Sequence, residues 1–211
     1  MIAAERNFHP TVAEETFKRF LRCPPRFPFD GPLGENARWA RQWFAAHGRP
    51  WFGALELEAE VRPDHGLRVD GTDMGTPTLA ARFSGVASVV LAAVSAGPEA
   101  EAEATARWQA DEPDRYFFID SYASAVVSEL LREVTRRIEV WAGARTVLPL
   151  HCLGFRGWPV TDTVPLVDLL RRRAALPGRL EALSSGMLSP KKSQLALLGL
   201  RPGEPAGKGG R

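Results

Sequence analysis

Two short segments in the last third of the chain carry residue types that could hold a ligand. The glycine loop, residues 154–159, places two glycines, two aromatic residues and a proline within six positions. Glycine permits positive φ and a close backbone approach, whereas proline stops a helix from running through. The lysine segment, residues 185–193, ends in two lysines and a serine, just before the apolar run at 195–200. Donor-rich loops beside a buried strand commonly bind the polar end of a ligand.

These two segments supply the candidate ligand-binding residues. The glycines and aromatic residues would form the wall of a cleft, and the lysines and serines would form its polar edge. A tight turn beside a solvated lysine pair is the alternative, and the residue types leave both interpretations open. The candidates are Gly154, Phe155, Arg156, Gly157, Trp158, Ser189, Lys191, Lys192 and Ser193.

Motifs for catalysis or metal binding do not accompany these segments. The sequence has no Gly-x-Ser-x-Gly turn and no glycine-rich dinucleotide motif after a strand. The four histidines are scattered, and the adjacent residues His151 and Cys152 have poor geometry for holding one zinc ion. We therefore predict no catalytic residues and no metal site.

Composition and charge exclude several classes of protein. With 211 residues, 45% hydrophobic and 25% charged, the sequence is typical of a globular protein with a sizeable core. A net charge of +2 does not indicate a nucleic-acid partner, and no apolar run reaches the roughly 20 residues of a membrane helix. Two distant cysteines and the lack of an apolar signal core near Met1 predict reduced thiols and a cytoplasmic location. We expect one domain at 1–200 and a disordered tail at 201–211.

Hydrophobic periodicity predicts the elements that would position the two segments. Residues 54–61 alternate between apolar residues and three glutamates, as in an antiparallel strand with one solvated face. Residues 86–94 are small and apolar, as in a central strand, and residues 116–141 carry an apolar stripe at helical spacing. Further helices are predicted at 11–21, 35–47, 76–83, 97–108 and 161–173, and further strands at 67–69, 146–148 and 195–200. The predicted N-caps are Thr11, Thr76 and either Thr161 or Asp162.

Three blocks of the sequence resemble the activation domain of cobalamin-dependent methionine synthase, in its short free-standing form. The blocks are residues 118–127, the glycine loop and the lysine segment, and their order and spacing agree with that family. The run Gly-Met-Leu-Ser-Pro-Lys-Lys-Ser is the most specific of them. The resemblance covers roughly residues 11–200. It implies an α+β fold with a twisted, mainly antiparallel sheet flanked by helices.

The resemblance also implies a ligand and a partner. In the full enzyme this domain binds S-adenosylmethionine and docks over the cobalamin module, so that inactive cobalt is reductively methylated with a flavodoxin-type electron donor. The chemistry belongs to the cofactor, and the domain supplies binding and orientation. The implied partner is a corrinoid-binding methyltransferase or a methionine synthase module. Because the chain has no Asp-x-His-x-x-Gly motif, we expect it to bind no cobalamin by itself.

The sequence departs from the family where S-adenosylmethionine would be held. Leu150 stands where the family has an arginine for the ligand carboxylate, and Phe155 replaces a tyrosine. A family glutamate for the ligand amino group falls on Ser128, with Glu129 one position away. A leucine cannot replace a bidentate arginine–carboxylate contact. We therefore predict a degenerate ligand site, at which Arg156 is the residue that could reach the carboxylate instead.

Three hypotheses about function follow from the sequence. In the first, the chain is a docking accessory without catalytic residues, in corrinoid-dependent methyl transfer or methionine metabolism. In the second, it is a reductive activator that still uses S-adenosylmethionine or another anionic molecule, through Arg156, Lys191 and Lys192. In the third, it is a protein-interaction module whose inherited cleft is filled by its own aromatic residues.

Overall fold

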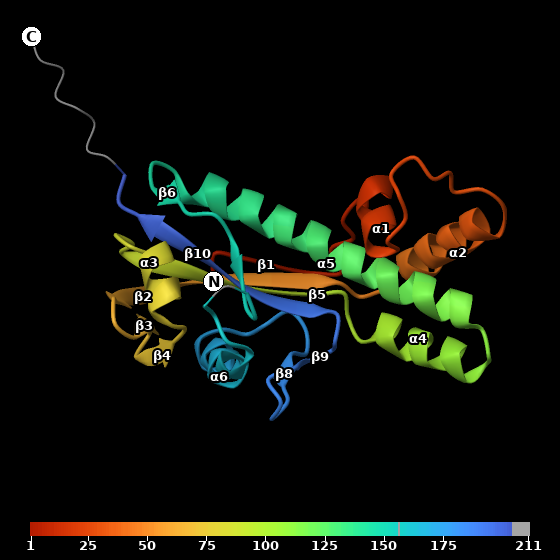
Figure 1. Ribbon diagram of the computed structural model, residues 1–211. Coiled ribbons are helices and arrows are strands. Elements are labelled where there is room, and N and C mark those ends of the chain that lie inside the picture. Colours follow the sequence, from red (N-terminus) through yellow and green to blue (C-terminus); the bar gives the residue numbers. More distant parts are fainter. Residues whose placement is uncertain (156, 204–211) are drawn as a thin grey trace, which may run out of the picture.

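Strand β5 (Ser88–Ser95) lies at the centre of the main sheet and is almost entirely buried. The structure is a computed structural model that describes residues 1–155 and 157–203 (Figure 1). Between its terminal serines β5 contains only valine, alanine and leucine, which suits a strand covered on both faces. The strand predicted from this apolar run is therefore confirmed.

The main sheet has eight strands, and their pairings are antiparallel. β2 (Trp51–Arg62) and β10 (Ser193–Arg201) pair with β5 on its two sides. The order is β4-β3-β2-β5-β10-β6, with β1 also paired to β2 and β7 also paired to β10. The shorter strands of this sheet are β1 (Ala3–Arg6), β3 (Gly66–Val69), β4 (Thr72–Met74), β6 (Thr146–Val147) and β7 (His151–Cys152). A separate hairpin pairs β8 (Glu181–Ala182) with β9 (Leu188–Ser189).

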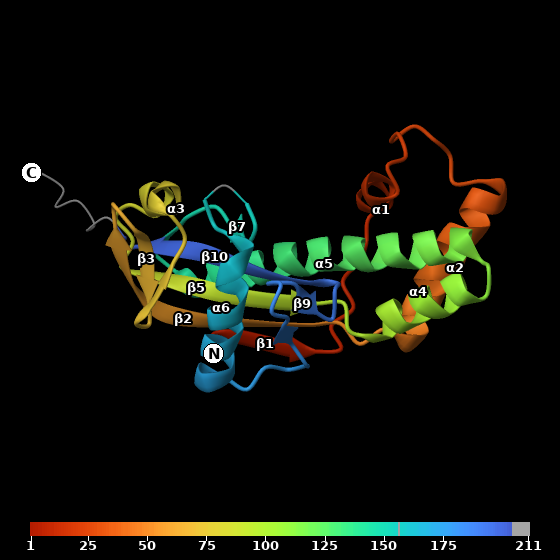
Figure 2. The ribbon, with the colours of Figure 1, turned by 60° about the horizontal axis from the view of Figure 1, so that its bottom comes forward.

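Alternate residues of β5 face two separate cores, because successive side chains of a strand point to opposite faces. Val90 belongs to the core under α5, and Leu91 belongs to the core under α6. Figures 1 and 2 show α5 along one face of the sheet and α6 on the other, with α1, α2 and α4 gathered around one end of α5. The first core is covered by α1 (Glu14–Phe20), α2 (Gly31–His47), α4 (Glu99–Gln109) and α5 (Pro113–Ala142). The second core is covered by α3 (Pro77–Arg82) and α6 (Thr163–Arg173). The 3-10 turn η1 (Val160–Asp162) directly precedes α6.

The helix α5 is 30 residues long, or about 45 Å at 1.5 Å per residue. It buries one stripe, formed by Ile119, Val126, Leu130, Val134 and Ile138, all at most 1% exposed. This is the apolar stripe predicted from the sequence, and Pro113 stands in the first turn, where no backbone N–H is needed. The long helix thus connects the helical end of the molecule to the sheet.

Some predicted element boundaries need correction. The prediction that Thr11 caps the first helix is wrong, because α1 begins at Glu14 and its N-cap is Ala13, without a side-chain capping bond. α2 begins at Gly31, earlier than predicted, because Pro32 occupies its first turn rather than a preceding loop. The short strands β1 and β4 were not predicted at all.

The three glutamates of β2 do not share one environment. Glu58 and Glu60 are exposed, as predicted for a solvated strand face. Glu56 is half-buried, and its Oε1 accepts hydrogen bonds from Ser88 Oγ and from Arg145 Nη1, both at 2.7 Å. Glu56 is therefore part of a contact between the sheet and the turn that follows α5.

Neither α5 nor any other helix within the described residues is long and apolar enough to cross a membrane. Most of the tail predicted at 201–211 lies outside those residues, since the structure describes the chain only as far as 203.

Candidate ligand-binding and docking site

The glycine loop and the lysine segment meet at β10. β7 pairs with β10, so the loop leaves the sheet directly beside Leu195. The Leu153 N–H donates to Leu195 O at 3.1 Å, and Gln194 Nε2 donates to Leu153 O at 3.3 Å. The two segments that the sequence singled out are thus brought to one edge of the sheet.

The glycine loop is closed by its own backbone and rests on α3. The Gly154 N–H donates to Trp158 O at 2.9 Å, and the Thr76 hydroxyl donates to Gly157 O at 2.8 Å. Gly154 and Gly157 have φ of +86° and +87°, a region that favours glycine. A Cβ at Gly157 would lie 2.7 Å from Thr78 Cβ, whereas one at Gly154 would meet nothing within 4 Å. Position 157 therefore needs glycine for space as well as for conformation.

A second contact joins the same part of the chain to α3. The Gly75 N–H donates to Asp162 Oδ2 at 2.6 Å. Burial raises the pKa of the Asp162 carboxyl, and the bond from Gly75 opposes that rise. Thr76 and Asp162 hold the predicted N-cap positions of α3 and α6, but neither side chain caps its own helix. Instead, Thr76 connects the start of α3 to the glycine loop, and Asp162 connects it to the η1 turn before α6.

The two aromatic residues of the loop have opposite environments. Trp158 is 1% exposed and stacks on His151, with centroids 6.2 Å apart and an interplanar angle of 18°. His151 Nε2–H donates to Phe155 O at 2.9 Å, and burial raises the pKa of the neighbouring Cys152 thiol. Phe155 is 62% exposed. Trp158 therefore supports the loop from the core, and Phe155 is the aromatic side chain that the loop presents to solvent.

The two lysines face α4 and α5 rather than the glycine loop. Lys192 Nζ donates to Asp120 Oδ2 at 2.8 Å and to Ser124 Oγ at 2.9 Å. Lys191 Nζ lies 3.5 Å from a carboxylate oxygen of Glu101 and is more exposed. Both cations are thus paired with carboxylates of the chain itself.

The remaining candidates complete this description. Ser193 Oγ donates to Ser95 Oγ at 2.9 Å, which joins β10 to β5. Ser189 is half-buried in β9. Arg156 lies outside the described residues. A ligand-binding role for the nine candidates stays a prediction. The two parts of the expected cleft contact different elements: the glycine loop contacts α3, and the lysines contact α4 and α5.

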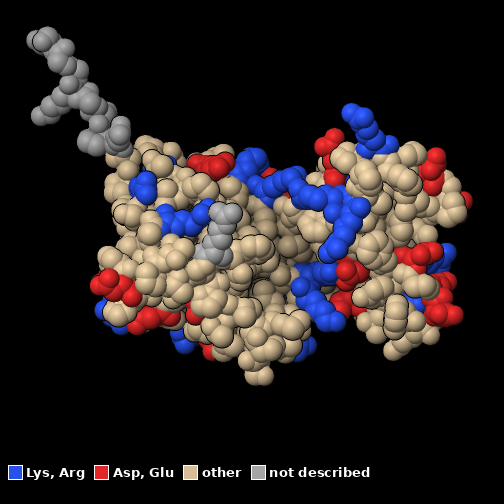
Figure 3. Space-filling view, in the orientation of Figure 1, with Lys and Arg blue, Asp and Glu red and all other residues tan. Residues whose placement is uncertain are grey.

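Exposed apolar side chains occur on the glycine loop, on η1 and the start of α6, and on the turn between β8 and β9. The turn between β8 and β9 packs on η1, since a Cβ at Gly186 would lie 2.5 Å from Val160 O. In Figure 3 the surface over the β8–β9 hairpin is formed mainly by uncharged residues. We call the following set the apolar rim: Phe155, Val160, Val164, Leu183 and Met187, each more than a third exposed.

Comparison with solved structures decides the fold. A crystal structure of the MetH reactivation domain bound to AdoHcy matches with a TM-score of 0.64, and the match covers 96% of this chain and 80% of that chain. The chain has the MetH reactivation-domain fold. At 12% identity the likeness concerns the fold alone. No protein-family model matches the sequence, and no curated protein matches it. The α+β fold with a mainly antiparallel sheet, which the sequence resemblance implied, is confirmed.

Within this reactivation-domain fold, the positions expected to anchor S-adenosylmethionine have other contacts. Leu150 is half-buried and packs against the first core. Ser128 Oγ accepts a hydrogen bond from Arg19 Nη2 at 3.2 Å. The Glu129 carboxylate accepts two from Arg132 Nη1, at 2.9 and 3.0 Å. Ser128, the position expected to attract an ammonium group, therefore faces the Arg19 guanidinium. The neighbouring acid, Glu129, is already paired with Arg132.

The contacts between α1 and α5 were missed by sequence reasoning. Arg19 and Ser128 are 109 positions apart, and Thr16 and Arg132 are 116 apart, so no local pattern connects them. Spacing within α5 does carry a signal, because residues four apart lie next to each other on a helix. The polar residues of α5 that contact the lysine segment and α1 form one row at this spacing: Asp120, Ser124, Ser128 and Arg132.

Proposed function

We propose that the chain is a docking protein without catalytic residues, whose partner is a corrinoid-binding methyltransferase module. The apolar rim is the observation that carries this proposal. Exposed apolar groups of this kind commonly mark protein–protein contacts, and aromatic residues and methionine are enriched in them. Phe155 is 62% exposed and Met187 is 51% exposed, whereas the two lysines of the lysine segment are paired within the chain.

The choice of partner has two supports. The fold is that of a MetH reactivation domain, which favours a methyltransferase. The three sequence blocks resemble the activation domain of cobalamin-dependent methionine synthase, which favours the corrinoid-binding class. In this proposal, recognition depends on shape and apolar contact at the rim rather than on a bound small molecule.

Binding to a purified, cobalamin-loaded corrinoid module from a methionine synthase of the same organism tests this proposal. We expect Phe155→Ser and Met187→Ser each to weaken the complex about tenfold, measured by sedimentation or calorimetry, because truncating a central interface residue costs about 1–2 kcal/mol. Val140→Ser is the matched control, since Val140 is 73% exposed on α5 outside the rim. Failure to form a complex, or an equal loss in the control, would contradict the proposal.

Binding of S-adenosylmethionine is a second candidate function, and one observation favours it. The MetH reactivation domain of the same fold was crystallised with AdoHcy. In this chain Leu150 offers no contact to a carboxylate, and Arg19 at Ser128 would repel an ammonium group. The ligand would therefore need other partners, for which Arg156 and the lysine segment are the candidates from the sequence.

Calorimetric titration with millimolar S-adenosylmethionine separates the two functions. Saturable heat that is lost in Arg156→Ala would support a reductive activator of a corrinoid methyltransferase. Absence of both heat and thermal stabilisation would contradict ligand binding and leave the docking proposal standing. A protein that binds the module equally well with and without cobalamin would instead be a general interaction module.

A further inference from the structure

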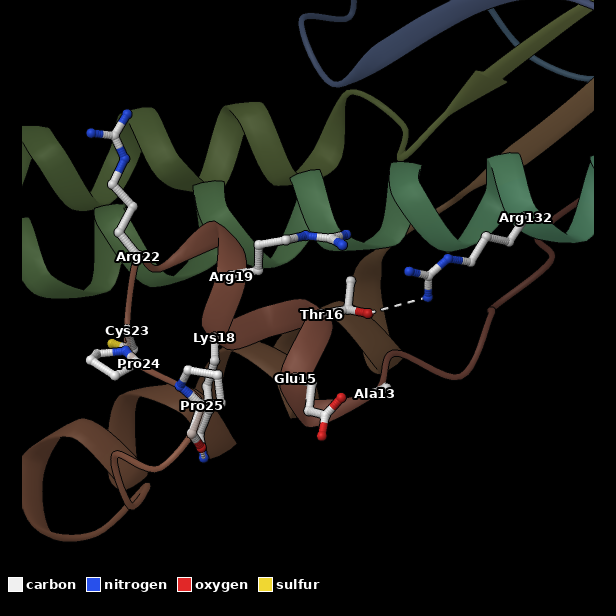
Figure 4. A pocket seen from close by; sticks show the side chains of 10 residues that line it. All are labelled: Ala13, Glu15, Thr16, Lys18, Arg19, Arg22, Cys23, Pro24, Pro25 and Arg132. Carbon is white, nitrogen blue, oxygen red and sulfur yellow. Dashed lines mark hydrogen bonds between the residues drawn. The ribbon is translucent and has the colours of Figure 1, made fainter. Parts of the chain in front are cut away.

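A groove of about 630 Å³ separates α1 and the loop after it from the side of α5 (Figure 4). Its size is within the range of sites for small organic ligands. Ala13, Cys23, Pro24 and Pro25 contribute its neutral wall. The polar part consists mainly of basic side chains, and it lies away from the apolar rim and from the glycine loop.

Two guanidinium groups enter the same space in this groove. In Figure 4, Arg19 extends from α1 and Arg132 extends from α5, each toward the other above Thr16. Arg19 Nη2 donates to Ser128 Oγ at 3.2 Å, and Arg132 Nη1 donates to Thr16 Oγ1 at 3.4 Å. Both hydroxyl groups act as acceptors in these bonds, so their own hydrogens are available to a further acceptor.

Much of the donor capacity of the two arginines is unused. Arg132 makes its contacts to Thr16 and Glu129 through Nη1, and Arg19 makes its side-chain hydrogen bond through Nη2. A guanidinium has five N–H donors in a planar fork. Among the described residues, neither Nε nor the second terminal nitrogen of these two arginines has a hydrogen-bond partner.

The lining has excess positive charge where the two arginines meet: Arg132 is paired with Glu129 at 2.9 Å, and Arg19 contributes a second guanidinium. Within the described part of the chain, Arg19 and Arg22 have no carboxylate oxygen within 4.0 Å. Lys18 is paired with Glu14 at 2.7 Å. Glu15 also lines the groove, but in Figure 4 it points away from the two guanidinium groups. Figure 3 shows a band of Lys and Arg atoms over α5 beside α1.

We propose that this groove binds the phosphate or carboxylate group of a small anionic ligand, held between Arg19 and Arg132. A bound oxyanion would accept hydrogen bonds from both guanidinium groups and from the hydroxyl of Thr16, which also lines the groove. Charge-assisted contacts of this kind are about twice as strong as neutral ones, and planar forks match the geometry of oxyanions. The anion would also screen the repulsion between two like charges. This site is independent of the docking surface proposed above.

Calorimetry on the full chain at constant ionic strength tests the site, with inorganic phosphate, pyrophosphate and succinate as probes. We expect saturable binding at one site. Whether phosphate or succinate binds more tightly shows whether the groove prefers a phosphate or a carboxylate group. Arg19→Ala and Arg132→Ala should each weaken binding about tenfold or more, because each removes charge-assisted hydrogen bonds. Thr16→Val removes a hydroxyl without changing charge and should weaken binding about threefold or more.

Arg172→Ala is the matched control, because Arg172 is exposed on α6 and its loss changes the net charge equally. We expect less than about a twofold effect there, as for a charge far from the ligand. Arg19→Lys keeps the charge and gives a second variant in case Arg19→Ala is poorly folded, and it should still weaken binding. Lack of saturable binding by every probe up to about 10 mM, or an equal loss in Arg172→Ala, would overturn the site.

Discussion

Lys192 and Lys191 are neighbours in sequence, yet their side chains differ in burial and in the groups that they contact. Lys192 connects the start of β10 to Asp120 and Ser124 of α5, and its side chain is 21% exposed. The Lys191 side chain is 65% exposed and reaches Glu101 at 3.5 Å. A short, half-buried ion pair with an additional hydroxyl contact stabilises a fold more than an exposed pair does.

We expect Lys192→Met to lower the free energy of unfolding by about 1–2 kcal/mol, because Asp120 and Ser124 lose their shared donor. Lys191→Met removes the same charge from an exposed site and should cost less than about 0.5 kcal/mol. Urea denaturation of both variants at neutral pH measures the difference. Equal effects would mean that Lys192 is a solvated side chain, as in the simpler interpretation of the lysine segment.

The sequence identified both lysines but could not distinguish them. Their partners lie far away in the chain: Asp120 is 72 positions from Lys192, and Glu101 is 90 positions from Lys191. Residue type and local spacing show that a cation is present, whereas its partner depends on how α4 and α5 pack against β10. The same reason explains why the contact between Arg19 and Ser128 was not foreseen.

At the scale of elements, the glycine loop acts as a tie between β7 and α3. Gly157→Ala would place a Cβ 2.7 Å from Thr78 Cβ and 2.8 Å from Thr76 Oγ1, in addition to the strain of positive φ. We expect a loss of about 2–3 kcal/mol in stability. Gly154→Ala has nearly the same φ but open space, so it should cost about 1 kcal/mol.

Thermal or urea unfolding of the two glycine variants measures this comparison. The two positions share their backbone conformation, so the difference between them reports the contact with α3 alone. A loss at Gly157 no larger than the loss at Gly154 would show that the loop does not rest on α3.

Elements with long periodic patterns were predictable, and short ones were not. The stripe that includes Val126 and Leu130 identified α5, and the apolar run of β5 identified the central strand. Strands β1 and β4 are too short to show a pattern, and β1 is a strand only because β2 pairs with it. Thr76 was correctly placed at a helix start, and Asp162 was one of two predicted alternatives, but their tertiary partners override local capping.

For the whole molecule, the two cores share one sheet. Leu130 is fully buried in the core under α5, and Leu166 is fully buried in the core under α6. Because β5 contributes side chains to both cores, loss of packing on one face also removes support from the other. The molecule should therefore unfold as one unit, although it has two separate apolar clusters.

We expect Leu130→Ala and Leu166→Ala each to cost about 2–5 kcal/mol, the usual range for truncating a buried leucine. Both variants should keep a single transition when far-ultraviolet and near-ultraviolet circular dichroism are followed together. Two separate transitions in either variant would show that the cores unfold independently. The exposed control Leu183→Ala, at 48% exposure, should change stability by less than about 0.5 kcal/mol.

The architecture as a whole was recognisable from three sequence blocks, although the crystallised MetH reactivation domain shares only 12% identity with the chain. Glycines and prolines at fixed turns retain a fold's signature while most surface residues change. A ligand site follows different rules, since a side-chain replacement such as the one predicted at Leu150 leaves the backbone intact. For that reason the fold was predictable from these blocks, and the contacts between α1 and α5 were not.

The row of polar residues along α5 has a consequence for how binding preference can change. Ser128 lies in that row between the hydroxyl of Ser124 and the guanidinium of Arg132, with Arg19 opposite. A carboxylate at this one position would pair with Arg19 and cancel the positive charge that an anion requires. The groove would then keep its shape but lose one of the two guanidinium groups that favour an anion. A single substitution on a rigid helix could therefore change ligand preference without changing the fold.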